Sequence, residues 1–452
     1  MSKNSEQPVS TVARHTFGSW MAQSRWKAPL HVADAAGVYF YDLNSKRYLD
    51  FSSQLMCSNL GHKNRALIES MKEQADKLPY LNPAFTCNVK EDATEALLKV
   101  MPKGIEVFFY STSGTEANEA AVKIARSYLA ESSKYKIISR YHSYHGSTAG
   151  SIALTGDVRR WYAEPLGKMQ GTLFAPDAYC YRCPFKLEHP DCGITCAEYL
   201  DHMISMEGNV AAMILEPVVG TNGVIVPPEE YLPRVREITE EHEVILIADE
   251  VMSGWFRTGK WFAVNNWGVV PDILTTAKGA TGAFMPLGIT ATSRKIQEFF
   301  EDRYFPHGHT YAAHPMTLSP VKPAVNEYER LEKSGHIHAV SQYLGKRLRE
   351  LPEDHPSIGD VRGLGMFWGI EIVKNRESRE PFNTRADKYA LKPLMVDRVA
   401  SECMKRGVYV SAWVSHLVVA PPLIVTQEQI DEGVDALAEA LALADKEVEP
   451  GT

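Results

Sequence analysis

The sequence predicts an α/β protein with two domains: a large domain with a mostly parallel sheet flanked by helices, and a smaller α+β domain built from both termini. The length indicates more than one core, because 452 residues exceed what a single compact domain usually holds. Strand and helix patterns alternate through the middle of the chain, and several strands are nearly continuous in Val, Ile and Leu, as in parallel sheets covered on both faces. From about Tyr328 the alternation gives way to an α+β pattern.

The alternating pattern places the large domain at residues 66–325. Its expected strands are 106–112, 136–141, 210–218, 244–251 and 272–279, and its expected helices are 65–78, 91–101, 115–130 and 229–243. Residues 326–452 are the C-terminal part of the small domain, with a helix at 340–351, strands at 365–373 and 407–413, and a closing helix at 426–446. Residues 1–65 supply the N-terminal part, which includes a β-hairpin at 37–54 around an Asn-Ser turn.

Composition and charge exclude several classes of function. The chain is 44% hydrophobic and carries a net charge of −8, without a basic stretch interleaved with aromatic residues, so nucleic acid is not an expected partner. No apolar run approaches the ~18 residues of a membrane span, and the polar start does not resemble a signal peptide. Seven cysteines in a chain of this size suit a reducing compartment. We therefore expect a soluble cytoplasmic protein.

One lysine stands where an apolar strand ends. In "DILTTAKG", residues 272–279, Lys278 follows a run that reads as a buried strand. Burying an ammonium group is costly unless the charge is paired, so this position needs a reason. A surface lysine with a buried stem is the alternative that this segment alone leaves open.

Polar groups also follow the neighbouring strands. Ser113-Gly114-Thr115 comes between a strand and a helix, where free backbone N–H groups can bind phosphate. Residues 142–146 follow the next strand, Glu216 follows another, and Asp249 ends a third. Ligands of open parallel sheets bind at the carboxyl ends of the strands, so these groups and Lys278 should lie together. An Asp–Lys ion pair is the structural alternative.

This set of groups has the chemistry that pyridoxal phosphate requires. The cofactor needs a lysine for a Schiff base and a carboxylate to hold the proton of its ring nitrogen. It also needs an aromatic ring to stack on and N–H donors for its phosphate. Each of these is present at a predicted strand end.

Six ordered motifs resemble those of class III aminotransferases, which are fold-type I pyridoxal-phosphate enzymes. They are "STSGTEANEAAVKIAR", "YHSYHGST", "ILEPVVGTNGVIVPP", "LIADEVMSGWFRTGKWF", "DILTTAKG" and "HGHTYAAHP", and the resemblance extends from about residue 15 to residue 445. It implies the fold-type I architecture and a transaminase acting on a small-molecule amine donor and a keto acid acceptor. The resemblance is to the members that act on omega-amino acids, amines and taurine.

The resemblance assigns roles to the groups at the strand ends. Lys278 would bind the cofactor covalently and then move the proton of the substrate, and Asp249 would hold the proton on the ring nitrogen. The remaining cofactor contacts would come from Ser113, Gly114 and Thr115 at the phosphate, Val251 and Tyr144 on the two ring faces, and His145, Gly146 and Glu216 beside the ring. Thr310 would reach the phosphate of a neighbouring subunit, which implies a homodimer, or a tetramer of such dimers.

The substrate side departs from the family pattern. Relatives that use pyruvate often have an arginine nine residues before "APPL", and this chain has Ser411 there, with Trp413 nearby. Arg159 and Arg160 are the nearest replacements for binding a carboxylate. Met56 stands where amine-accepting relatives often have tryptophan, and Trp20 could supply an aromatic wall instead. We expect an amine on a terminal carbon as donor and pyruvate as acceptor, with 2-oxoglutarate as the second choice for the acceptor.

Three alternatives remain open from the sequence. Cys180, Cys183, Cys192 and Cys196 have the paired spacing of a structural zinc site, although we favour reduced, partly buried thiols as the explanation. His307, His309 and His314 are close in sequence but do not have a helical ligand spacing. Finally, the family contains decarboxylases, aminomutases and racemases, so the resemblance by itself does not fix the reaction.

Overall fold

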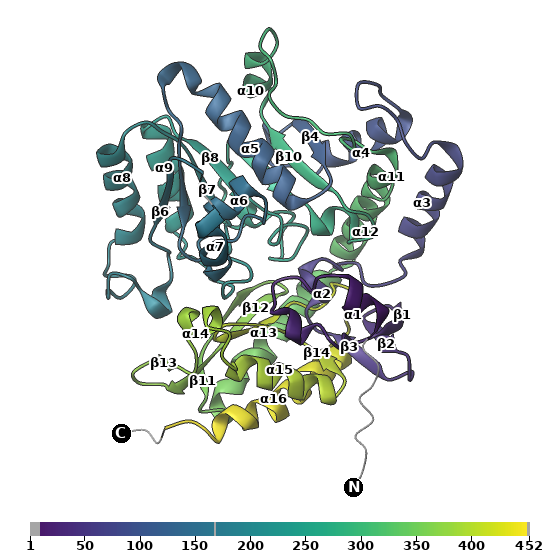
Figure 1. The fold of residues 1–452 in the computed structure, drawn as a ribbon, viewed down its shortest axis with the longest axis vertical. Coiled ribbons are helices and arrows are strands. Elements are labelled where there is room, and N and C mark those ends of the chain that lie inside the picture. Colours follow the sequence, from purple (N-terminus) through teal and green to yellow (C-terminus); the bar gives the residue numbers. More distant parts are fainter. Residues whose placement is uncertain (1–9, 167–168, 450–452) are drawn as a thin grey trace.

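The computed structural model describes residues 10–166 and 169–449, which form three β-sheets surrounded by helices (Figure 1). The largest sheet has seven strands in the order β4-β10-β9-β8-β7-β5-β6. These strands are β4 (Val107–Ser111), β5 (Lys136–Arg140), β6 (Thr172–Ala175), β7 (Val210–Leu215), β8 (Ile245–Asp249), β9 (Ile273–Thr276) and β10 (Gly288–Thr292). Strand β10 alone runs antiparallel to the other strands of this sheet, so the predicted mostly parallel sheet is confirmed. The sequence patterns do not predict β6 or β10.

Helices cover both faces of this sheet. The helices α5 (Gly114–Tyr128) and α6 (Ala149–Leu154) pack on one face, and α8 (Thr195–Glu207) and α9 (Tyr231–Glu241) pack on the other. Successive side chains of a strand point to opposite faces, so Met213 of β7 contributes to one core and Ile214 to the other. Burial on both faces is the reason that the strands are almost continuously apolar.

A second sheet joins the two ends of the chain. It contains β1 (Val32–Ala36), β2 (Tyr39–Asp42), β3 (Arg47–Asp50) and β14 (Val408–Tyr409). The predicted hairpin is confirmed, because β2 and β3 pair antiparallel on either side of the Asn-Ser turn. Strand β14 pairs parallel with β3, so the purple and yellow segments lie side by side in the lower half of Figure 1.

The third sheet comes from the C-terminal part of the chain. Its strands are β11 (Ile358–Leu364), β12 (Phe367–Asn375), β13 (Glu380–Pro381), β15 (Ser411–Trp413) and β16 (His416–Val419). The single strand predicted at 407–413 is therefore divided. Its first half, β14, belongs to the second sheet, and its second half, β15, pairs with β16. The change of sheet occurs at the buried Val410.

The remaining helices lie around these sheets. They are α1 (Thr11–His15), α2 (Ser53–Met56), α3 (Arg65–Lys77), α4 (Asn88–Leu98), α7 (Val158–Ala163), α10 (Arg294–Phe299), α11 (Pro315–Leu318), α12 (Val321–Lys333), α13 (His336–Asp354), α14 (Arg385–Tyr389), α15 (Met395–Lys405) and α16 (Gln427–Asp445). The helix predicted at 91–101 ends early, at Leu98, because Pro102 disfavours a helical conformation in the residue before it.

Arg257 ties the large sheet region to both ends of the chain. Its side chain is fully buried and has no carboxylate partner among the described residues. Instead its guanidinium donates to the carbonyls of Met366 and Pro421, at 3.1 and 2.7 Å, and to the side chains of Ser53 and Asn59, at 3.0 and 2.7 Å. Removing this side chain would leave four buried acceptors without a donor, which is costly. Ser53 is close in sequence to Met56, and Pro421 is close to Val418, and both Met56 and Val418 line the cavity described next.

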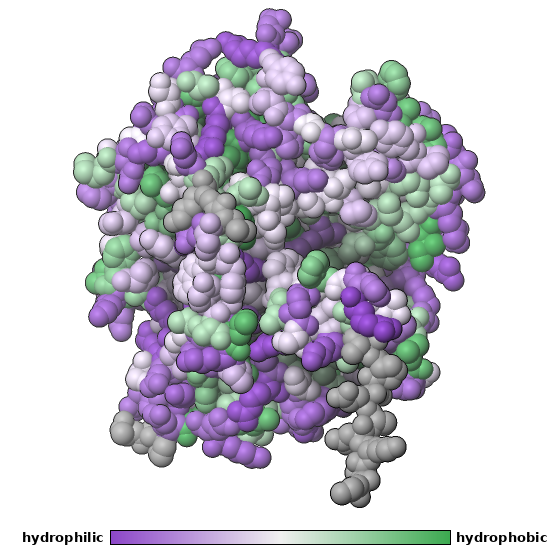
Figure 2. Space-filling view, viewed as in Figure 1, coloured by the Kyte–Doolittle hydropathy of each residue, from purple (hydrophilic) through white to green (hydrophobic). Residues whose placement is uncertain are grey.

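The visible surface is mostly hydrophilic, and its hydrophobic residues occur in small groups (Figure 2). Among the described residues, no helix combines the length and apolar character needed to cross a bilayer.

Candidate active site

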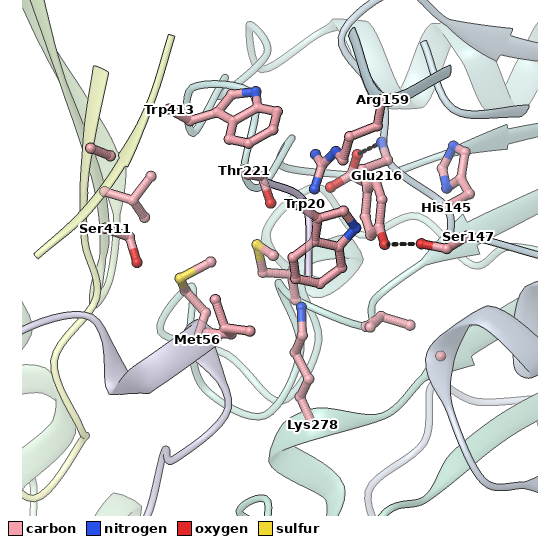
Figure 3. A pocket seen from close by; sticks show the side chains of 18 of the residues that line it. Trp20, Met56, His145, Ser147, Arg159, Glu216, Thr221, Lys278, Ser411 and Trp413 are labelled. Atoms are coloured by element: carbon pink, nitrogen blue, oxygen red, sulfur yellow. Dashed lines mark hydrogen bonds between the residues drawn. The ribbon is translucent and has the colours of Figure 1, made fainter. Parts of the chain in front are cut away.

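A cavity of about 660 Å³ lies at the carboxyl ends of the parallel strands (Figure 3). Its floor comes from the large sheet, through the residues that end or follow β4, β5, β7, β8 and β9. Its other walls come from the N-terminal segment, from α15 and from β15. The predicted residues on the cavity are Trp20, Met56, Gly114, Thr115, Tyr144, His145, Gly146, Arg159, Glu216, Asp249, Val251, Lys278, Ser411 and Trp413. The convergence predicted from strand ends is therefore present.

Asp249 is buried at the end of β8, and its carboxylate is held from three sides. Asn118 Nδ2 donates to Oδ2 at 2.7 Å, the backbone N–H of Val251 donates to Oδ1 at 3.0 Å, and His145 Nδ1 lies 2.7 Å from Oδ2. A carboxylate only accepts hydrogen bonds, so His145 carries its hydrogen on Nδ1. These contacts keep an ionised carboxylate in place at a buried position.

Lys278 follows β9 and extends its amine into the cavity (Figure 3). Its backbone has a φ of +37°, which is a strained conformation for a residue with a side chain. Burial lowers the pKa of its ammonium group, and Arg159 lowers it further, whereas Cys57, Asp249 and Glu216 act in the opposite direction. No hydrogen bond or ion pair holds the side-chain amine of Lys278 among the described residues. The alternative of an Asp–Lys ion pair is therefore wrong, and the amine is available for chemistry.

Glu216 fixes the loop that carries Tyr144. Its Oε1 accepts from the backbone N–H of Tyr144 at 2.9 Å, and its Oε2 accepts from the backbone N–H of Gly220 at 2.8 Å. Burial raises the pKa of Glu216, and the charge of Asp249 adds to this effect. The two backbone donors stabilise the ionised form of Glu216. Through the contact with Tyr144 N–H, Glu216 also positions the Tyr144 loop beside Asp249.

The start of α5 has the features of a phosphate site. Ser113 is the N-cap, and its hydroxyl accepts from the backbone N–H of Glu116. In the described part of the chain, the backbone N–H groups of Gly114 and Thr115 have no acceptor. A Cβ on Gly114 would lie 2.7 Å from Val251, and a Cβ on Gly146 would lie 2.6 Å from the Thr115 hydroxyl. Both glycines therefore allow the close packing of the backbone against Val251 and Thr115 at this corner of the cavity.

Arg159 lies on the substrate side of the cavity, stacked on two aromatic rings. Its guanidinium carbon is 3.8 Å from the ring centre of Tyr144 and 4.4 Å from that of Trp413. Asp157, the N-cap of α7, accepts from Arg159 Nε at 2.7 Å and is itself bonded to Asn222 at 3.2 Å. No acceptor is found for Nη1 of Arg159 among the described residues, so this edge can bind an anion.

The expectation that Arg160 contributes to the substrate site needs correction. Arg160 is not on the cavity wall; it pairs with Glu164 and packs over the ring of Phe174 at 4.3 Å. Consecutive residues of a helix point about 100° apart, so α7 can direct only one of the two arginines to the cavity. That residue is Arg159.

Trp20, Met56 and Ser411 form the wall opposite the sheet. Trp20 meets the edge of the Tyr144 ring at 6.3 Å between centres and is 53% exposed, so it stands at the mouth of the cavity. Met56 is buried. The backbone N–H of Ser411 donates to the hydroxyl of Ser52 at 2.8 Å. Ser411 brings no charge to this wall.

Comparison with known proteins agrees with this geometry. A family model for class III aminotransferases matches residues 21–441. A putrescine–pyruvate aminotransferase of Pseudomonas aeruginosa is 32% identical over 414 residues, which are 89% of this chain and 88% of that protein. A leucine/methionine racemase of Thermococcus litoralis is 32% identical over 425 residues, or 92% and 91% of the two chains. The structure of a taurine:2-oxoglutarate aminotransferase from Bifidobacterium kashiwanohense, in complex with pyridoxal phosphate and glutamate, matches with a TM-score of 0.92 and 33% identity over 98% of each chain.

The chain belongs to the class III aminotransferases. Its fold is the fold-type I architecture of these enzymes, and it depends on pyridoxal phosphate. The cavity of this aminotransferase fits that cofactor, because one corner offers free N–H donors beside two glycines and the floor offers a fixed carboxylate and an unpaired amine.

Thr310 lies away from the cavity of its own chain. The residue is exposed, and its carbonyl accepts from the hydroxyl of Tyr80 at 3.2 Å. Its expected contact with the cofactor of a neighbouring subunit stays a prediction.

The cysteine and histidine clusters give little support to a metal site. Cys180, Cys183, Cys192 and Cys196 line one small cavity, and all four are free thiols. Within the described residues, however, no group of three or more His, Cys, Asp or Glu side chains is placed so that it could hold a metal ion. Of the three histidines, His314 caps α11 and His307 lies 3.2 Å from the amine of Lys123. The zinc alternative therefore has no support from the arrangement.

Sequence reasoning does not identify Asn118 as a site residue, although it touches Asp249 directly. Asn118 lies one helical turn after Gly114 on α5 and also bonds Thr275 of β9 at 2.6 Å. Its position inside the "TEANEA" motif, one turn from the phosphate corner, is the signal that could identify it. The wall from α15, which includes Asp397 and Ser401, has no comparable signal, because it reaches the cavity only through the tertiary fold.

Proposed function

We propose that this aminotransferase moves the amino group of a terminal amine that carries an acidic group, such as an omega-amino acid or taurine, to pyruvate. Arg159 is the observation that carries the proposal. Apart from Lys278, it is the one lysine or arginine among the described residues that line the cavity. It stands across the Tyr144 ring, with a free edge for a carboxylate or sulfonate.

The residues of the floor would bind the cofactor and move the proton. Bound pyridoxal phosphate supplies an aldehyde carbon and an electron-withdrawing ring. Ser113, Gly114 and Thr115 would hold the phosphate, and Val251 and Tyr144 would pack on the two ring faces. Asp249 would hold the proton of the ring nitrogen, with Asn118 and His145 fixing its carboxylate. Lys278 Nζ would link to the cofactor, and once displaced it would take the proton from the amine-bearing carbon of the donor.

The same arginine would serve both half-reactions. Donor and acceptor occupy one cavity in turn, and both carry an acidic group, which lies beside the reacting carbon in pyruvate and further from it in an omega-amino acid or taurine. Ser411 can give one neutral hydrogen bond but no charge, so Arg159 replaces the arginine that relatives have at that position.

Arg159→Gln should raise the KM for pyruvate about tenfold or more and change kcat less, because a charge-assisted contact in the bound state is lost. Arg160→Gln is the matched control, since it removes the same charge one residue away and off the cavity. Steady-state kinetics of both purified variants check this. A KM for Arg159→Gln that is as close to normal as that of Arg160→Gln would contradict the role of Arg159.

A screen of donors against pyruvate and 2-oxoglutarate should rank terminal amines with an acidic group above α-amino acids. The readout is formation of the amino product from each keto acid, measured by chromatography. Ornithine or acetylornithine as the best donor by a wide margin would overturn the donor proposal. Racemisation of an amino acid without any need for a keto acid would replace it with the reaction named for the Thermococcus relative.

We also propose that the active unit is a cytoplasmic homodimer in which Thr310 reaches the phosphate of the neighbouring subunit. The exposed position of Thr310 supports this, and the seven free cysteines suit a reducing compartment. Light scattering combined with activity measurements should show that activity and cofactor are lost together when the protein dissociates. A fully active monomer would refute the shared site.

A further inference from the structure

A second cavity, of about 170 Å³, adjoins the substrate cavity on the far side of Trp413. Trp413 lines both cavities, and its indole N–H donates to Asn222 at 3.0 Å. The second cavity is lined from separate parts of the chain: Arg182 ends a short helical turn, Glu371 lies in β12, and Arg385 begins α14. No part of the proposed transamination uses this cavity.

Arg385 brings an uncompensated charge to the cavity. Within the described part of the chain it makes no hydrogen bond and no ion pair, and its Nη2 is buried without a partner. The charges of Asp177 and Asp157 act on Arg385, but neither carboxylate forms an ion pair with it. Asp177 is already engaged by His142 at 2.6 Å, and Asp157 by Arg159.

Arg182 offers a second buried donor. Its Nε donates to Glu371, whereas its Nη2 is buried without a partner. The oxygens of Glu371 accept from Nε of Arg182, from the hydroxyl of Tyr179 and from Arg362 at 2.9 Å, but not from Nη2 of Arg182. The acid on the cavity wall therefore already has three donors, while one nitrogen in each of two guanidinium groups has no acceptor.

The two histidines on the wall, His142 and His416, do not give the cavity a negative charge that would bind a cation. Burial lowers the pKa of His416 to about 3, so its ring is neutral at physiological pH. His142 uses Nδ1 for its contact with Asp177. Unpaired buried N–H groups are costly, and an oxyanion is the ligand that a guanidinium recognises best.

We propose that this second cavity binds a small oxyanion, a carboxylate or a sulfate-like group, between Arg182 and Arg385. The site lies one aromatic ring away from Arg159, but it is separate from the substrate position. Carboxylate and sulfate share the chemistry that two guanidinium groups recognise, so the experiment includes both.

The test measures the thermal unfolding midpoint of the holoenzyme against sodium sulfate and, separately, sodium acetate. Sodium chloride keeps the ionic strength constant, and the phosphate corner is filled by the cofactor. Arg385→Gln removes a proposed ligand. Lys392→Gln is the matched control, because it removes a charge from the same segment at an exposed ion pair with Asp387. Arg159→Gln controls for binding in the substrate cavity.

The expected result is a saturable rise of the midpoint in the wild type, the Lys392→Gln variant and the Arg159→Gln variant. Arg385→Gln should need about tenfold more anion, as for the loss of one charge-assisted contact. Of sulfate and acetate, the preferred anion is the one whose effect on the unfolding midpoint saturates at the lower concentration. A non-saturable rise that is equal in all four proteins would be general salting-out and would overturn the proposal. Loss of the effect in Arg159→Gln alone would also overturn it.

A direct measurement covers the case in which Arg385→Gln does not fold. Crystals of the wild-type holoenzyme soaked in selenate should show an anomalous peak between Arg182 and Arg385. A well-ordered cavity without such a peak would overturn the proposal.

Discussion

The buried carboxylate of Asp249 is the constraint on which the rest of the site depends. A carboxylate at the end of an apolar strand is tolerated only when its charge is met by well-placed donors. Here the donors come from three different elements: Asn118 from α5, His145 from the loop after β5, and the backbone of Val251. The hydrogen bonds to this one carboxylate therefore hold α5 and the Tyr144 loop against the end of β8. The same contacts set the position of the phosphate corner relative to Lys278.

The two sides of the cavity come from different parts of the chain. The floor carries the residues proposed for the chemistry, and the opposite wall carries residues proposed for substrate specificity. The floor comes from strand ends of the large sheet, whereas the opposite wall comes from the N-terminal segment, α15 and β15. Arg257, which follows β8, is bonded to Ser53 and Asn59 of the N-terminal segment and to Met366 and Pro421 of the C-terminal part through four buried hydrogen bonds. Relatives named for putrescine, for taurine and for racemisation share the fold, so the substrate has to be argued from the wall residues of this chain.

The floor of the site could be predicted from the sequence, and its wall only in part. Parallel strands end at a common edge, so Asp249, Glu216 and Lys278 could be brought together from the strand pattern alone. The pattern could not choose between Arg159 and Arg160, because the choice depends on how α7 is rotated against the sheet. Nor could it show that Lys278 is unpaired, since Asp249 is held by Asn118 and His145, and which side chains reach a buried carboxylate depends on the tertiary fold. The division of residues 407–413 between two sheets was hidden for a similar reason, because strand pairing is a tertiary property.

The central claim is that Lys278 is the amine that links to the cofactor. Reduction of the holoenzyme with borohydride, followed by mass mapping of its peptides, tests this most directly. The account predicts a single pyridoxyl adduct on the peptide that contains Lys278. An adduct on another lysine, such as Lys388 beside Trp413, or a cofactor released without any adduct, would contradict it.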